Sequence, residues 1–144
     1  MKYLFTILFF ISINANAQLI TTQSIVKYSL VFVSGAADGV NQTLWYHYDN
    51  FKRVHPGAND EYWNPYISSN NMNNSTLWSR TIGRGFQDGN HATRWFERNP
   101  IILSGAFTII SNGDNWWGYV FDFVTGVIVR AIGFHLTYSI IYHE

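Results

Sequence analysis

This chain of 144 residues contains no cysteine, only three prolines and few charged side chains. The lack of cysteine excludes disulfides, thiol redox chemistry and metal sites built from thiolates. Lys and Arg together number 9, Asp and Glu also number 9, and charged residues make up only 12% of the chain. Such a chain has no basic field to attract nucleic acid, so we expect no nucleic-acid partner. We also expect no cofactor.

Aromatic residues, in contrast, are abundant. They make up 18% of the chain, with 6 Trp, 9 Tyr and 11 Phe. Aromatic side chains favour β-strands, and at binding surfaces they supply rigid contact area at a low cost in entropy. The composition therefore predicts a strand-rich protein in which some of the aromatic side chains line a binding surface.

The first 17 residues are typical of a cleavable signal peptide. Lys2 provides the positive start, Leu4 to Ile13 carry no charge, and the small residues Ala15 and Ala17 flank Asn16. The apolar run is about half of the roughly twenty residues that a spanning helix needs. We therefore predict a signal peptide over 1–17 and one domain over 18–144, secreted to the extracellular space or, in a bacterium, to the periplasm.

The pattern after residue 17 favours an all-β fold. Apolar and polar residues alternate over 20–32, and strand-like segments follow over 43–48, 77–82 and 91–96. The last third contains strand-like runs over 101–111, 116–124, 127–132 and 134–142, which Gly/Asn turns separate. We predict an antiparallel β-sandwich of the jelly-roll or lectin type, or a barrel, with a long irregular segment over 49–76.

The segment from Tyr119 to Ile141 is apolar enough to raise a membrane interpretation. It contains Asp122, Arg130 and His135, and a charge in mid-bilayer costs on the order of 2.5–3.5 kcal/mol on insertion scales. Its glycines and β-branched residues also disfavour a helix. Consecutive buried strands explain the segment, so we expect no membrane insertion.

Two clusters combine aromatic, amide and charged groups. The first runs from His47 to His55, and its His47, Asp49 and His55 are also the residues that a metal site would use. A strand end with solvated polar residues explains this cluster more simply, so we predict no metal site. The second cluster is Arg94-Trp95-Phe96-Glu97-Arg98, where a ring beside charged groups suits a sugar, or packs in a core.

The order of these residues resembles that of galectins, the β-sandwich lectins that bind β-galactosides. The matching residues are His47, Asn50 and Arg53, then Trp95, Glu97 and Arg98, then Pro100, Gly105 and Phe107. The spacings within the first two groups differ from those of galectins. The resemblance implies a carbohydrate-binding face built from His47, Asn50, Arg53, Trp95, Glu97 and Arg98.

We therefore expect a secreted, non-catalytic binding module whose partner is an extracellular glycan. The first alternative is a secreted factor that binds a protein, and the second is a small hydrolase that takes paired carboxylates from Asp88, Glu97, Asp114 and Asp122. No Gly-x-Ser-x-Gly motif supports a serine nucleophile. Glycosylation motifs place candidate N-glycosylation sites at Asn41, Asn73 and Asn74.

Overall fold

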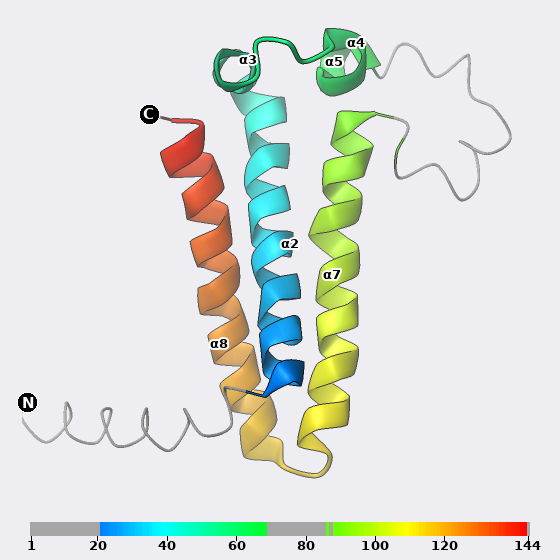
Figure 1. Cartoon of the computed structure of the whole chain (residues 1–144), viewed down its shortest axis with the longest axis vertical. Helices are drawn as coiled ribbons and strands as arrows, with labels where there is room; N and C mark the ends of the chain where they lie inside the picture. Colours follow the sequence, from blue (N-terminus) through cyan, green and yellow to red (C-terminus); the bar gives the residue numbers. More distant parts are fainter. Residues whose placement is uncertain (1–20, 69–85, 87, 144) are drawn as a thin grey trace, which may run out of the picture.

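The computed structural model describes residues 21–68, 86 and 88–143, and this part of the chain is helical. Three long helices lie side by side: α2 (Thr22–Tyr46), α7 (Gly89–Asn112) and α8 (Trp116–His135), which η3 (Leu136–Ile141) continues as a π-helix (Figure 1). The short helices α3 (Tyr48–Val54), α4 (Asp60–Trp63) and α5 (Pro65–Ser68) cover one end. We call this the capped end, and we call the opposite end, where residues 113–115 join α7 to α8, the hairpin end.

Polar side chains mark where the long helices begin. The oxygens of Thr21, Asp88 and Asn115 accept hydrogen bonds from the backbone N–H groups of Ser24, His91 and Gly118, respectively. Each acceptor satisfies a donor that the first helical turn leaves free. The hairpin between α7 and α8 turns at Gly113, whose φ of 50° is a conformation that glycine adopts without steric cost.

The helix α2 lies between the other two and packs along both, whereas α7 and α8 have few contacts with each other. Glycines allow α2 and α8 to approach closely. A Cβ on Gly35 would overlap the backbone of Arg130, and a Cβ on Gly133 would overlap the carbonyl oxygen of Phe32. A Cβ on Gly39 would lie 3.0 Å from the carbonyl oxygen of Phe134. This is the close packing through small residues that is common between membrane helices.

The predicted β-sandwich or barrel is wrong, because the described residues form helices and no strand. The alternating segment over 20–32 lies largely in α2, and the strand expected over 43–48 covers the end of that helix. The strands expected over 91–96 and 101–111 lie in α7, and those expected over 116–124, 127–132 and 134–142 lie in α8–η3 and its end. The turn predicted at Asn112-Gly113 is present, but it joins two helices. Thr125-Gly126, predicted as a hairpin turn, lies inside α8. Apolar runs without clear alternation fit a buried strand and a helix equally well, so the spacing of apolar residues does not distinguish the two in these segments.

The capped end contains the compact apolar cluster of the described residues. Leu44 of α2 and Phe51 of α3 are buried there, and Tyr142 at the end of η3 packs with them. The ring centroid of Phe51 lies 5.3 Å from that of Trp63 and 5.8 Å from that of Tyr142. This cluster holds the short helices against the ends of α2 and η3. The segment predicted as an irregular loop over 49–76 therefore contains three short helices within its described part.

Candidate functional site

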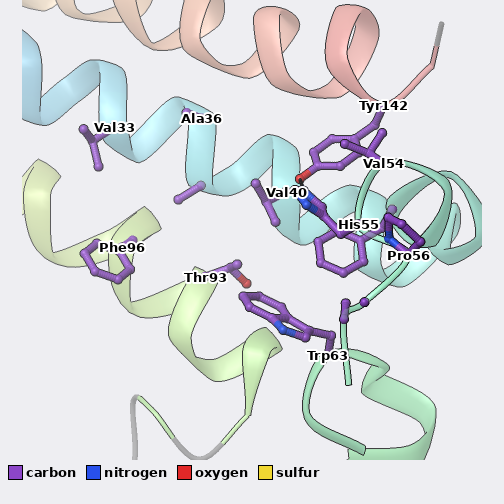
Figure 2. Close-up of a pocket in the computed structure, with 14 residues that line it drawn as sticks. Val33, Ala36, Val40, Val54, His55, Pro56, Trp63, Thr93, Phe96 and Tyr142 are labelled. Carbon is purple, nitrogen blue, oxygen red and sulfur yellow. Dashed lines mark hydrogen bonds between the residues drawn. The ribbon is translucent and has the colours of Figure 1, made fainter. Parts of the chain in front are cut away.

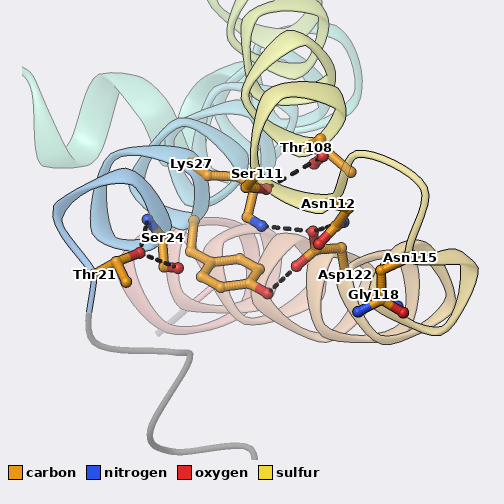
Figure 3. A network of polar contacts seen from close by, with 10 residues as sticks. Thr21, Ser24, Lys27, Thr108, Ser111, Asn112, Asn115, Gly118 and Asp122 are labelled. Carbon is orange, nitrogen blue, oxygen red and sulfur yellow. Dashed lines mark hydrogen bonds and ion pairs between the residues drawn. The ribbon is translucent and has the colours of Figure 1, made fainter.

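The first polar network joins all three long helices near the hairpin end (Figure 3). The carboxylate of Asp122 in α8 accepts hydrogen bonds from Lys27 Nζ at 2.6 Å and from the Tyr28 hydroxyl at 2.6 Å. It also accepts one from Asn112 Nδ2 of α7 at 2.7 Å. The side chains of Lys27 and Asp122 are only 6% and 9% exposed. A buried charge is stable only when it is paired and hydrogen-bonded, and this network meets both conditions.

A second charged group lies farther along the same helices. Arg130 Nη2 of α8 is 2.7 Å from Asp38 Oδ2 of α2 and 3.8 Å from Glu97 Oε1 of α7. The backbone carbonyl of Glu97 also accepts a hydrogen bond from the buried hydroxyl of Ser34. One guanidinium therefore faces two carboxylates, one from each neighbouring helix.

The third network is neutral and lies toward the capped end. Buried Asn41 of α2 donates from Nδ2 to Asn90 Oδ1 at 2.8 Å and to Thr93 Oγ1 at 2.9 Å. The indole N–H of Trp45 donates to the same Asn90 oxygen at 2.8 Å. Together the three networks form a polar seam along α2, and every fully buried polar side-chain atom of the described residues has a partner.

The outward faces of the helices are apolar. Ile102 of α7 is 67% exposed, Phe123 of α8 is 72% exposed, and Ile110 of α7 is 69% exposed. A water-soluble helical protein has the reverse distribution, with large apolar side chains inside and charges outside. The most exposed large apolar side chains of α7 and α8 are Ile102, Leu103, Ile109, Ile110, Trp116, Trp117, Phe123, Val124, Val127, Ile128 and Ile132.

Two cavities accompany this arrangement. One lies under the cap, has a volume of about 740 Å³ and is lined by Val33, Val40, Trp63, Phe96 and Tyr142 among other residues (Figure 2). His55 Nε2 and the Tyr142 hydroxyl, 3.1 Å apart, lie at its edge. The other is a groove of about 850 Å³ between α7 and α8, whose lining includes the charged side chains of Lys27, Asp122 and Arg130.

Short-range electrostatics also stabilise the cap. Asp60 accepts hydrogen bonds from Lys52 Nζ at 2.7 Å and from the Tyr48 hydroxyl at 2.7 Å. The hydrogen bonds from Lys52 and then from Tyr48 lower the pKa of Asp60 below its ordinary value of 3.8. Burial, followed by the hydrogen bond to Asp60, raises the pKa of Tyr48.

The structure separates the residues predicted to bind carbohydrate. His47 lies at the junction of α2 and α3 and contacts the rings of Tyr138 and His143. Asn50 and Arg53 lie in α3, and Arg53 Nη2 donates to the carbonyl oxygen of Tyr142 at 3.2 Å. All three residues of this first group therefore belong to the cap, and two of them contact the C-terminal end of η3.

The second predicted group lies on α7. The ring of Trp95 packs against Phe86 and Phe96, and its side chain is 39% exposed. The carboxylate of Glu97 faces Arg130 of α8, whereas Arg98 is exposed. Trp95, Glu97 and Arg98 therefore have different neighbours, and none of the contacts described above joins them to His47, Asn50 or Arg53. The carbohydrate-binding face that would unite all six residues stays a prediction from the sequence.

The alternative sites can be placed in the same way. Among residues 21–68, 86 and 88–143, no three His, Asp or Glu side chains are grouped so as to hold a metal ion. Asp88 caps α7 and contacts His91, while Asp122 is engaged with Lys27. Asn41 is buried between α2 and α7, so attachment of a glycan would require its hydrogen bonds to break. Asn73 and Asn74 lie outside the described residues.

Sequence reasoning missed the polar seam. Lys27 and Asp122, or Asp38 and Arg130, are more than 90 residues apart, and no local pattern links them. One signal was present, because the few charges in apolar segments require partners. In the sequence, Asp122 and Arg130 disfavour a membrane segment, but in the structure each faces an opposite charge of α2.

Comparisons of the chain with protein-family models, with curated proteins and with solved structures find no match. Function is therefore inferred from the geometry of this chain.

Proposed function

We propose that this protein is an integral membrane protein in which α2, α7 and α8–η3 cross the bilayer, and that it acts by binding rather than by catalysis. The observation that carries the proposal is the reversed distribution of side chains. Lys27, Ser34 and Asn41 are buried between helices, whereas Ile102 and Phe123 face outward. In hydrocarbon this distribution is favourable, because lipid solvates the apolar surface and the helices satisfy one another's polar groups.

The length and apolar character of one helix, and its aromatic residues, support the same proposal. Among the described residues, Trp116–Ile141, with 26 residues, is the one helical segment that is long and apolar enough to cross a membrane by itself. Trp116 and Trp117 lie near its start, and Tyr138 lies 22 residues after Trp116, about 33 Å along a helix. The hydrocarbon core of a bilayer is about 30 Å thick, and Trp and Tyr are enriched at both of its edges.

The small buried fraction of this segment argues against the main alternative. A core helix of a water-soluble protein can have the same length and hydropathy, but most of it is buried in the fold. Here only 11% of the most apolar stretch of 18 residues in Trp116–Ile141 is buried. The segment is helical despite its β-branched residues and glycines, and Gly133 packs against α2. The charges Asp122 and Arg130 are paired.

Two arginines of α7 also fit a bilayer. Arg94 and Arg98 lie in the half of α7 nearer the capped end, where this helix begins. Because Cα–Cβ bonds tilt toward the N-terminus of a helix, both stems lean toward the capped end. Long arginine side chains can place their charge at the headgroups while the stem stays in the apolar layer.

Site-directed spin labelling tests the proposal directly, because the chain has no cysteine and each introduced cysteine is unique. We choose Phe123→Cys on the outward face of α8 and Asp114→Cys in the hairpin. In lipid vesicles, a label at 123 should collide with oxygen and be protected from a water-soluble nickel complex. A label at 114 should be accessible to the nickel complex and should collide less with oxygen. Equal access of the nickel complex to both labels would exclude a membrane-spanning α8.

A second candidate function comes from the cavity under the cap. Its volume of about 740 Å³ lies within the range of about 300–1,000 Å³ that is usual for small-molecule sites. Most of its lining is apolar, so it suits an apolar small molecule (Figure 2). Ala36→Trp should fill it and abolish the uptake of a fluorescent apolar probe, while Ala131→Trp on the outer face of α8 should not. Equal uptake by both variants would refute this second function.

The secreted glycan-binding module stays a prediction from the sequence. It requires His47, Asn50 and Arg53 to share a face with the second predicted group, and the structure offers less support for this than for a membrane bundle. A glycan array with correctly folded protein would test it.

A further inference from the structure

Within the described residues, the groove between α7 and α8 has one face of α2 at its base. Its floor is formed by Lys27 and Val31 of α2, and its walls include Ile102 of α7 together with Phe123 and Val127 of α8. Its volume of about 850 Å³ is larger than that of the cavity under the cap. The walls are apolar, so the groove is compatible with the interior of a bilayer, yet charged groups border its floor.

These charges do not balance. Lys27 and Asp122 form a neutral pair, but Arg130 faces both Asp38 and Glu97. The charged side chains of these two ion-pair networks are therefore two cations and three carboxylates. The side chains of Arg130 and Glu97 are 35% and 26% exposed, so this ion pair is accessible from outside the bundle. In a bilayer, a surplus carboxylate requires a cationic partner.

Two glycines on the walls of the groove have no close neighbour from another described element. Gly35 and Gly133 lie against the backbone of the neighbouring helix, where a Cβ would overlap it. At these two positions glycine therefore allows the helices to pack closely. Gly105 of α7 and Gly126 of α8 also line the groove, but within the described residues no atom of another element lies within 4 Å of where their Cβ would be. Glycine destabilises a helix interior relative to alanine, and within the described part of the chain no close helix contact at these two positions offsets that loss.

We propose that the groove between α7 and α8 binds a transmembrane helix of another protein, and that this helix carries one basic residue near its middle. The inference rests on the membrane location proposed above. Glu97 does not line the groove itself, but it lies one helical turn before the groove residue Ile101 and 3.8 Å from the groove residue Arg130. The basic side chain would extend from the groove to pair with Glu97 and make the seam neutral, and the backbone of the helix would approach Gly105 and Gly126. A second copy of this chain brings the same surplus negative charge, and a lipid tail brings no cation, so neither neutralises the seam.

The test uses the full-length chain in phosphatidylcholine vesicles and three synthetic Leu/Ala peptides of transmembrane length. The peptides differ only at the central residue, which is Lys, Leu or Glu. Energy transfer between labelled protein and labelled peptide reports binding. We expect the Lys peptide to bind about tenfold more tightly than the other two, as a charge-assisted contact implies. Glu97→Gln should remove this preference, while Arg130 keeps its partner Asp38.

Steric variants separate the groove from the rest of the surface. Gly126→Leu should block the Lys peptide, because Gly126 lines the groove and a Cβ there meets no other described element, so the larger side chain is expected to take up space in the groove. Ala131→Leu is the matched control on the same helix, since Ala131 is exposed and does not line the groove; it should bind as the wild type does. Gly105→Leu gives a second blocked variant on α7 if Gly126→Leu does not fold.

Three results would overturn the inference. Equal binding of the three peptides would remove the role of charge, and unchanged binding by both leucine variants at the glycines would remove the groove. Energy transfer between copies of this chain that Gly126→Leu abolishes would identify a second copy as the occupant. Flotation of the protein with vesicles, measured without peptide, separates the two proposals: protein that floats but shows no preference refutes only the helix partner.

Discussion

Gly133 sets the distance between α2 and α8, whereas at Gly126, two turns earlier on the same helix, there is room for a Cβ among the described residues. A Cβ at 133 would overlap the carbonyl oxygen of Phe32, but a Cβ at 126 would meet nothing within 4 Å. The same residue type thus has opposite roles at two positions of α8.

The pair gives a matched prediction. Gly133→Ala should destabilise the protein by about 1–3 kcal/mol, because the helices must separate to admit the methyl group. Gly126→Ala should stabilise the free protein by up to about 1 kcal/mol, through its higher helix propensity. Unfolding from detergent micelles, followed by circular dichroism, measures both. Similar changes at the two positions would contradict the packing described for Gly133.

The ion pair of Lys27 and Asp122 yields a second prediction at this scale. Asp122→Asn should cost about 3–5 kcal/mol of stability, because it leaves the ammonium of a buried lysine without its counter-charge. The double variant Lys27→Met, Asp122→Leu should recover most of that loss, since an apolar pair needs no counter-charge. Asp60→Asn, at an exposed position in the cap, serves as a control whose effect should stay local to the cap and change the global stability little. If the single variant at 122 were as stable as the control, the pair would have no structural role.

Among the elements, the short helices of the cap differ from the long ones, because their contacts are partly ionic and exposed. Asp60 joins α4 to α3 through Lys52 and Tyr48. The long helices depend on the buried seam and on close packing, so salt and pH should act first on the cap.

The cap should therefore weaken in acid. The pKa of Asp60 is lowered in the folded protein, so its stabilising contribution is complete above the ordinary value of 3.8 and is lost as the pH falls below it toward the folded pKa. Amide hydrogen exchange over 48–63 should accelerate below about pH 4 in the wild type. Asp60→Asn should exchange faster at neutral pH and respond less to acid. An identical pH response in both proteins would assign the effect to other carboxylates.

For the whole molecule, the distribution of cations predicts which end faces the cytoplasm. Six of the 9 Lys and Arg residues lie between positions 52 and 98, in or near the segment that joins α2 to α7, while the hairpin at 113–115 has none. Segments rich in Lys and Arg stay on the cytoplasmic side. The capped end should face the cytoplasm and the hairpin end the opposite side.

Labelling in intact cells tests this orientation. A membrane-impermeant maleimide should modify Asp114→Cys in intact cells and Asn59→Cys only after the membrane is opened. Both positions are exposed, so a difference in labelling reports the side of the membrane. The reverse pattern would invert the orientation without affecting the proposal that the protein spans the membrane.

Some features of this protein could be read from the sequence. The chain must fold without disulfides, residues 112–113 form a turn, and the segment over 119–141 is unusually apolar; these follow from composition and local turn chemistry. The type of secondary structure could not be read in the same way. A segment that is apolar on most sides has no clear period, so α8 also resembled a series of strands.

The candidate site depended on the tertiary structure for a different reason. Lys27 gains its role from Asp122, and Asp38 gains its role from Arg130, across separations of 95 and 92 residues. Their charges, read locally, only disfavoured a membrane. Once the helices are packed, the same charges face inward as pairs while the large apolar side chains face outward. The sequence alone determined which residues are polar, and the packing of α2 between α7 and α8 decided that they lie inside, because only there can they satisfy one another.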